Sequence, residues 1–305
     1  MRGTSAIDGI VLLDKPAGLS SNAALQRVKR AFGATKAGHT GSLDPLASGM
    51  LPVCLGEATK VAGVLLDGRK RYQFVIVLGE RTPSGDTESD VVEVRSVPPL
   101  ESAHVKTVLA SFAGSRLQTP PMYSALKHQG KPLYRLARRG IEVERAPREI
   151  RLEDIELESL SGSRLSLRVT CSKGTYIRAL AEDIAAALGT VGHVATLRRL
   201  WAEPFEALPM RELEELEAAD AEHRADFLLP PDTALRDLPQ VQLSAADASR
   251  LMNGQAVLWN ASAPVGRMRV YDRGGRFLGV ASLSSSGELQ PVRLAARLVT
   301  PGSDG

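Results

Sequence analysis

The spacing of apolar residues along this 305-residue chain changes between the period of a strand and the period of a helix. From Arg71 to Leu78, apolar side chains occupy alternate positions, which predicts a β-strand with one buried face. From Ile177 to Leu188 they recur every three or four residues and Gly189 follows, which predicts an amphipathic helix. Another helix is expected from Ser20 or Ser21, with Gly33 as its stop, and a short strand is expected over Val91–Val94. The chain must therefore combine strands and helices.

Composition excludes several classes of protein. A length of 305 residues predicts one large or two unequal domains. Hydrophobic residues at 43% and charged residues at 24% are ordinary for a globular protein with a core. Cys54 and Cys171 are too few for a disulfide framework or a thiolate zinc site. The start of the chain has no signal-like apolar region, and no run of 18 apolar residues occurs, so we expect a cytoplasmic protein with no membrane contact.

Charge is distributed unevenly, although the formal net charge is only +3. Residues 235–305 hold 8 Arg and 5 acidic residues, and the rest of the chain is balanced. Between Lys127 and Arg151, eight basic residues accompany three Glu. Local basic patches can bind a polyanion, although each patch alone is also typical of a solvated surface. Four basic residues recur at a spacing that places several on one side of a short helix or turn and could follow a phosphate backbone: Lys127, Lys131, Arg135 and Arg139.

Breaks in the pattern indicate how the chain is divided. Residues 118–149 are rich in Pro, Gly and Arg, with one short helix expected at 132–139, which is typical of an excursion from a core. Pro230, Pro231 and Pro239 form the best candidate for a linker. A helix at 245–253 and short strands follow, as in a small barrel. We therefore expect one domain over 1–234 and a β-rich domain over 235–305.

Asp44 lies in a glycine-rich irregular segment that also contains His39. An Asp followed by Pro45 is typical of a helix N-cap with proline at the first helical position. From the residues alone, this structural interpretation of Asp44 is favoured. The alternative is a functional carboxylate, because glycines allow a backbone to approach a ligand closely. His39 has the same two interpretations.

Arg178 falls in the first turn of the predicted helix at 177–188, where the helix dipole disfavours a cation. This position indicates a nearby anion, either a carboxylate or a phosphate; solvent exposure is the alternative. If the anion were Asp44, the pair would keep that carboxylate ionised. Tyr72 and Tyr176 are expected to pack in the core, or to stack against a base. The chain has no phosphate-binding loop, dinucleotide fingerprint or zinc-protease motif, so cofactor and metal chemistry are unsupported.

The run from Gly38 to Gly49 resembles the signature of one known family, the tRNA pseudouridine synthase B family. The other matching segments occur in the family's order: Lys15–Ser20, Lys70–Tyr72, Gln118–Lys127 at the start of an RNA-embracing insertion, Lys173–Arg178 and Leu197–Leu200. The resemblance is detailed from Gly9 to Leu200 and looser over the last 70 or so residues.

The resemblance implies an α+β fold with a mixed, largely antiparallel central sheet and a small C-terminal barrel similar to a PUA domain. It implies conversion of uridine 55 in the T-loop of tRNA to pseudouridine, with no cofactor. The expected substrate is the T-arm of tRNA, bound by a monomer that needs no protein partner.

The resemblance also assigns roles to particular residues. Asp44 matches the catalytic aspartate, and Arg178 matches the arginine that pairs with it. Tyr72 matches the ring that stacks on the flipped uracil, and its position also makes it a candidate for the base that removes the C5 proton. The remaining matches are Tyr176 and Leu197 in the base pocket, His39 near the vacated base position and Asp86 in the Asp44–Arg178 network.

Two other functions are compatible with the residues. The first is a non-catalytic RNA-binding protein or RNA chaperone that uses the same groove. The second is a hydrolase of glycosidic bonds with Asp44 as nucleophile, which needs a second carboxylate at suitable spacing. Asp86 is the candidate for that second carboxylate.

Overall fold

The computed structural model describes residues 7–220, 222–259 and 264–295. The chain divides into two compact units. The first unit comprises residues 1–43, 50–67 and 203–305, and the second comprises residues 44–49 and 68–202. Asp44 therefore belongs to the second unit, with the short segment 44–49, although the chain before and after this segment belongs to the first unit.

The first unit begins with a buried strand and a capped helix. Strand β1 (Gly9–Lys15) is followed by α1 (Ser21–Ala31). The Ser20 side chain accepts a hydrogen bond of 3.1 Å from the backbone N–H of Ala23, and Gly33 adopts φ +62°, so the predicted helix is confirmed. The other elements before the C-terminal module are β2 (Ala37–His39), β3 (Ser48–Leu55, whose first two residues belong to the second unit), η1 (Gly56–Lys60), α2 (Ala62–Leu65), β13 (Arg211–Glu212), α6 (Leu213–Ala218), η2 (His223–Phe227) and η3 (Pro231–Leu235).

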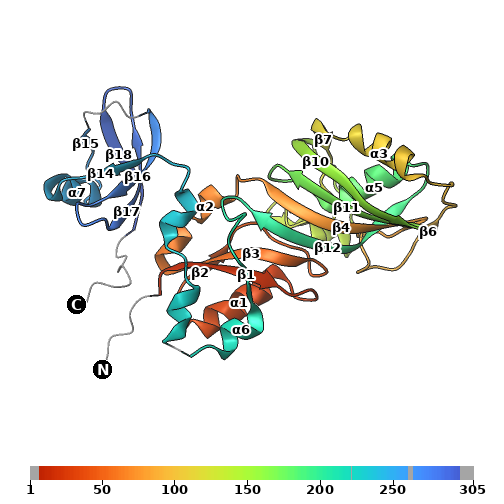
Figure 1. The fold of residues 1–305 in the computed structure, drawn as a ribbon, viewed down its shortest axis with the longest axis horizontal. Helices are drawn as coiled ribbons and strands as arrows, with labels where there is room; N and C mark the ends of the chain where they lie inside the picture. The colour runs from red at the N-terminus through yellow and green to blue at the C-terminus, as the bar shows by residue number, and fades with distance from the viewer. Residues whose placement is uncertain (1–6, 221, 260–263, 296–305) are drawn as a thin grey trace. The chain divides into compact units, whose positions relative to one another are not determined.

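The C-terminal part of the first unit is a curled five-stranded sheet with one helix (Figure 1). Its strand order is β14-β16-β17-β18-β15, and β14 pairs with β16 in parallel. A core of its own includes Leu251, Met268 and Leu289. The predicted linker is partly wrong, because Pro231 begins a 3-10 helix in which Pro231, Ala234 and Leu235 are buried. The elements are β14 (Gln240–Gln242), α7 (Ala245–Met252), β15 (Val257–Leu258), β16 (Gly266–Tyr271), β17 (Phe277–Leu283) and β18 (Glu288–Leu294); residues 260–263 and 296–305 of the predicted domain lie outside the described residues.

An antiparallel sheet with helices packed on it forms the second unit. Its strands follow the order β12-β4-β11-β10-β7. The predicted strand is confirmed, since Tyr72, Phe74, Ile76 and Leu78 are buried on one face of β4. A Cβ on Gly192 would lie 2.8 Å from the Cβ of Ala185, so glycine allows α5 to pack closely on β12. The elements are β4 (Lys70–Leu78), α3 (Ser102–Ala110), β7 (Gly114–Gln118), β10 (Arg148–Ser161), β11 (Arg164–Cys171), α5 (Ile177–Ala187) and β12 (Gly192–Ala202).

The strands and helices together confirm the expected α+β class. The large sheet that contains β1, β3, β4 and β12 is mixed and largely antiparallel. Parallel pairs occur where β1 meets β13 and where Ser48 and Gly49 meet β12. Within the described ranges, no helix is long and apolar enough to cross a membrane.

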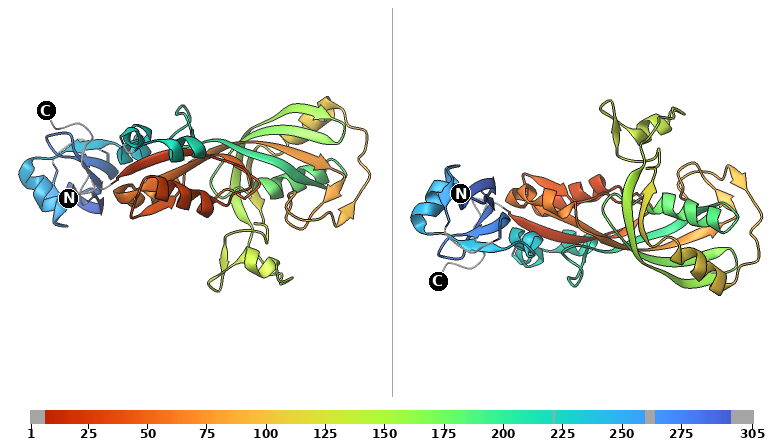
Figure 2. Two further views of the ribbon diagram at one scale, coloured as in Figure 1. Left: turned by 90° about the horizontal axis from the view of Figure 1, so that it is seen from below. Right: turned by 90° about the horizontal axis from the view of Figure 1, so that it is seen from above.

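Two segments of the second unit differ from a simple sheet. Residues 119–147 form an excursion with β8 (Lys127–His128), β9 (Lys131–Pro132) and α4 (Leu133–Ala137), which extends away from the sheet in yellow-green in both views of Figure 2. Helix α4 is shorter than the predicted 132–139. The predicted strand at 91–94 is reduced to β6 (Glu93–Val94), which pairs only with β5 (Glu80–Arg81) and leaves Val94 75% exposed.

Candidate active site

A bidentate ion pair joins the loop before β3 to the start of α5. The Arg178 guanidinium donates from Nε to Asp44 Oδ2 at 2.8 Å and from Nη2 to Asp44 Oδ1 at 3.1 Å. The Arg178 side chain is 4% exposed, whereas that of Asp44 is 37% exposed. The solvent-exposed alternative for Arg178 is therefore wrong. A fork-like pair of this kind fixes the carboxylate in direction and stabilises its ionised form.

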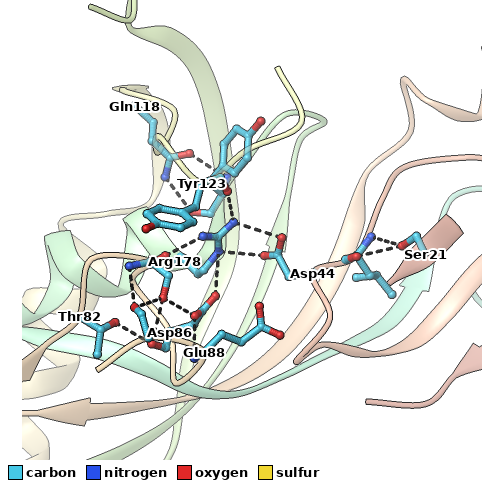
Figure 3. A network of polar contacts seen from close by, with 12 residues as sticks. Ser21, Asp44, Thr82, Asp86, Glu88, Gln118, Tyr123 and Arg178 are labelled. Atoms are coloured by element: carbon cyan, nitrogen blue, oxygen red, sulfur yellow. Dashed lines mark hydrogen bonds and ion pairs between the residues drawn. The ribbon is translucent and has the colours of Figure 1, made fainter. Parts of the chain in front are cut away.

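Backbone carbonyls hold the other side of the guanidinium (Figure 3). Arg178 Nη1 donates to the carbonyl of Ser84 and Nη2 to the carbonyl of Tyr123, both at 2.6 Å. These acceptors come from the turn after β5 and from the excursion at 119–147. Arg178 occupies the first turn of α5, where the dipole opposes a cation, so the surrounding acceptors are what stabilise its burial.

Asp86 lies on the buried side of Arg178. Its Oδ2 is 3.5 Å from Arg178 Nε, and its side chain is 2% exposed. The Asp86 carboxylate accepts hydrogen bonds from the Ser84 hydroxyl at 2.5 Å and from the backbone N–H of Glu88 at 3.0 Å. Burial raises the pKa of Glu88, and the charges of Asp86 and Asp44 raise it further. One guanidinium thus faces more than one carboxyl group.

No helix begins at Asp44, so the N-cap interpretation is wrong. The segment after Asp44 forms a turn in which the backbone N–H of Ala47 donates to the carbonyl of Asp44 at 3.1 Å. Strand β3 then starts at Ser48, too soon for a helical turn to follow Pro45. The carboxylate pairs with Arg178 and caps no helix.

Tyr72 and Leu197 share one face of the sheet. Tyr72 on β4 lies opposite Arg199 on β12, and Phe74 lies opposite Leu197. Tyr72 and Leu197 are 7% and 6% exposed, respectively. Burial raises the pKa of the Tyr72 hydroxyl, while the charge of Arg199 opposes this rise. Asp44 is among the charges that act on Tyr72, so the ion pair and the ring belong to one electrostatic neighbourhood.

Tyr176 immediately precedes α5 and is held by its backbone. The Gln118 side chain accepts from the N–H of Tyr176 at 2.8 Å and donates to its carbonyl at 3.1 Å. Gln118 is buried at the end of β7, so this clamp fixes the start of α5, two residues before Arg178. Burial raises the pKa of the Tyr176 hydroxyl.

The remaining predicted residues lie outside this cluster. His39 belongs to the first unit, where it ends β2 and pairs with Val53. The four basic residues of the excursion are all exposed. Lys127 and Lys131 lie on the paired strands β8 and β9, Arg135 lies on α4, and Arg139 follows the end of that helix.

Residues that the sequence analysis did not single out complete the site. Ser84 and Tyr123 contribute backbone carbonyls, which give no signal in a sequence. Arg199 is fully buried. The sequence could have indicated it, because residues two positions apart on a strand share a face and Arg199 follows Leu197 by two positions. Among the described residues, no group of three or more His, Cys, Asp or Glu is arranged to hold a metal ion. The arrangement offers an oriented carboxylate and a phenol, which can act on carbon centres or protons.

Models of one family match nearly the whole chain. The N-terminal domain of TruB family pseudouridylate synthases matches residues 29–177. The tRNA pseudouridylate synthase B C-terminal domain matches residues 178–236, and the C-terminal region of pseudouridine synthase II TruB matches residues 239–295.

Individual relatives give the same result. The chain is 50% identical to a tRNA pseudouridine synthase B of Chromohalobacter salexigens, over 96% of this chain and 95% of the relative. It is 49% identical to the protein of the same name from Nitrosococcus oceani, over 94% of each. A solved chain in an archaeal box H/ACA sRNP Nop10-Cbf5 complex shares the fold, with a TM-score of 0.70 at 23% identity, covering 94% of this chain and 85% of that chain.

Proposed function

Because the chain belongs to the tRNA pseudouridine synthase B family, we propose that it isomerises uridine 55 in the T-loop of tRNA to pseudouridine. The chain is an enzyme, an isomerase that acts on uridine in tRNA. The observation that supports the choice of site is the Asp44 carboxylate, 37% exposed and held in direction by a nearly buried guanidinium. Of the two carboxylates that pair with Arg178, Asp44 is accessible and Asp86 is buried.

The chemistry requires few groups. The C1′–N1 bond of uridine breaks, the uracil turns, and C5 bonds to C1′; the proton on C5 is lost and N1 gains one. The ionised carboxylate of Asp44 can act on C1′ or C6, or remove a sugar proton, and Arg178 keeps it ionised and aimed. Asp86 sets the position of Arg178 from its buried side. No atom is gained or lost overall, so the reaction needs no cofactor.

A base within a folded tRNA must leave its stack to reach Asp44. Flipping a nucleotide costs a few kcal/mol. Stacking on the Tyr72 ring would return about 1–3 kcal/mol. Leu197, on the same sheet face as Tyr72, and Tyr176, clamped by Gln118, would line the pocket for the flipped base. His39 would lie near the position that the base vacates.

Two surfaces would hold the RNA. The exposed basic residues of the excursion at 118–149 would contact phosphates of the T-arm, and the domain at 235–305, with 8 Arg, would bind a further part of the tRNA. The catalytic domain would then comprise residues 1–234. We further propose that the protein acts as a monomer in the cytoplasm and without an obligate protein partner.

The direct test is release of tritium from C5-labelled uridine in a T-arm stem-loop RNA. The wild-type protein should release one tritium per RNA, and a matched RNA with cytidine at position 55 and labelled uridines elsewhere should release none. Tight binding without release would instead favour the non-catalytic RNA-binding function. Free uracil would indicate a hydrolase, although Asp86 is too buried to reach a substrate as its second carboxylate.

Charge reversal on the excursion tests its contact with RNA. Arg135→Glu together with Arg139→Glu should weaken tRNA binding and reduce the salt slope of log affinity by about 0.9 for each lost phosphate contact. Both side chains are exposed, so the fold should persist. Binding is measured by filter retention across a salt series, with Arg164→Glu, an exposed residue of β11, as control. An unchanged slope would remove this segment from the interface.

A further inference from the structure

Helix α5 carries Arg178 but begins without the residues that usually stabilise a helix start. Its N-cap is Tyr176, whose side chain does not cap the helix, and its first turn contains no acidic residue. Arg178, the second residue of the helix, adds a cation where the dipole disfavours one. The first backbone N–H groups of a helix have no partners within it. The groups that fix this helix start therefore have to come from other elements.

Gln118, the last residue of β7, supplies the missing contact. Its Oε1 accepts from the backbone N–H of Tyr176 at 2.8 Å, and its Nε2 donates to the carbonyl of the same residue at 3.1 Å. In a capping box, a Glu or Gln at the third helical position accepts from the N–H of the N-cap. Alanine occupies that position in α5 (Ala179), and Gln118 makes the equivalent bond from a neighbouring strand (Figure 3).

The sheet holds the Gln118 amide in place. Gln118 is 5% exposed, and it lies opposite Arg148 in the antiparallel pair of β7 and β10. A side-chain amide has an acceptor and two donors in one plane, so it can pair with both the N–H and the carbonyl of a single residue. The Tyr176 carbonyl also accepts the first helical bond of α5, from the N–H of Leu180 at 3.0 Å. Gln118 therefore joins the sheet to the first hydrogen bond of the helix.

A second contact joins the same segment to the same helical turn. The excursion begins after Gln118, and the carbonyl of Tyr123 accepts from Arg178 Nη2 at 2.6 Å. Two consecutive prolines lie between these two contacts and restrict the backbone there. The start of the excursion thus holds the first turn of α5 both at Tyr176 and at Arg178. The Arg178 guanidinium in turn holds both carboxylate oxygens of Asp44.

We propose that Gln118 is a positioning residue for the reaction, an inference that rests on the proposed function. By holding the backbone of Tyr176, Gln118 fixes the end of the helix from which Arg178 directs the Asp44 carboxylate. Gln118 touches no reacting atom itself. Because a misplacement of about 1 Å can lower a rate by about 100-fold, a contact that acts only through Arg178 still matters for the chemical step.

The first test separates catalysis from binding. Gln118→Met removes both hydrogen bonds and nearly conserves the volume of the side chain. The single-turnover rate on T-arm RNA should fall by about 10- to 100-fold, while tRNA affinity should stay within about threefold of the wild type. The matched control is Gln73→Met, which should change neither quantity. Gln73 on β4 donates to Glu158 at 2.7 Å, on the sheet face opposite to the buried side chains of that strand.

A second test measures the hold on Arg178 directly and needs no RNA. The Arg178 Nε–H group donates to Asp44 at 2.8 Å. In protein labelled with ¹⁵N-arginine, its resonance is assigned by its loss in Arg178→Lys. Exchange of this proton with solvent should be about tenfold faster or more in Gln118→Met, at a temperature where the variant is fully folded. The exchange should stay as in the wild type in Gln73→Met.

A double variant tests whether Gln118 acts through Arg178. Arg178→Lys removes the two-point hold on Asp44, so a shift of the helix start has less left to disturb. Combining Gln118→Met with Arg178→Lys should therefore lower the rate by less than the product of the two single losses. Losses that multiply in full would mean that Gln118 acts independently of Arg178, which contradicts the inference.

The outcomes separate this inference from the proposed function. No pseudouridine from the wild-type protein would reject the proposed function, and the exchange measurement would still decide whether Gln118 holds Arg178. Product from the wild type with unchanged rate and exchange in Gln118→Met would overturn the inference alone. A rate loss matched by an equal loss of tRNA affinity would do the same. If Gln118→Met does not fold, Gln118→Asn carries the test, because its amide is one methylene short of the Tyr176 backbone.

Discussion

Asp44→Asn should lower the rate of pseudouridine formation by about 10⁴-fold or more while tRNA affinity stays within about threefold of the wild type. Asparagine keeps the shape of the side chain and one oxygen that can accept from Arg178, but it has no charge with which to act on the substrate. Arg178 remains anchored on the carbonyls of Ser84 and Tyr123, so the fold should persist. The measurement is tritium release under single-turnover conditions together with filter binding.

The control for this variant is Asp90→Asn, which removes an exposed carboxylate elsewhere in the second unit and should leave the rate unchanged. Thermal unfolding separates catalysis from structure. Because no helix begins at Asp44, the variant should not show the loss of about 1 kcal/mol that removal of an N-cap causes. A loss of tRNA binding together with a lower melting temperature would instead make Asp44 a structural residue.

Periodicity predicted the elements that position the site. The strand at 71–78 and the helix at 177–188 have clean patterns because one face of each packs against the other elements of a core, and they appear as β4 and α5. The strand predicted at 91–94 forms only over Glu93–Val94, because apolar composition alone does not supply a partner along the whole segment. Glu93 and Val94 pair only with β5, and the neighbouring valines stay exposed.

The site itself was only partly predictable. The unfavourable place of Arg178 in a first helical turn indicated an anion, and the partner is Asp44, 134 residues away along the chain. Local sequence favoured a cap for Asp44, because an Asp-Pro pair carries information about its neighbours in the chain and none about a distant partner. The carbonyls that anchor Arg178 belong to Ser84 and Tyr123, and a backbone carbonyl leaves no mark in the residue type. The roles of the residues came from the family resemblance and stay proposals.

Removal of the guanidinium should damage both stability and chemistry. Arg178→Met leaves Asp44 and the 2% exposed Asp86 without their common counter-charge. Taking away one partner of a buried ion pair costs about 3–5 kcal/mol, so we expect a loss of that size in the free energy of unfolding, measured by urea denaturation. A loss below about 1 kcal/mol would show that the carboxylates do not need this partner.

Arg178→Lys distinguishes charge from geometry in the same position. Lysine keeps the positive charge, but one ammonium cannot donate to both oxygens of Asp44 and also reach the carbonyls of Ser84 and Tyr123. The variant should therefore retain most of its stability and its tRNA affinity, yet lose about 10²–10³-fold in the single-turnover rate. Arg81→Lys is a matched control, because Arg81 pairs with Glu93 at the surface, where its side chain is 44% exposed. If Arg178→Lys reacted as fast as the wild type, charge alone would suffice and the direction of the Asp44 carboxylate would not matter.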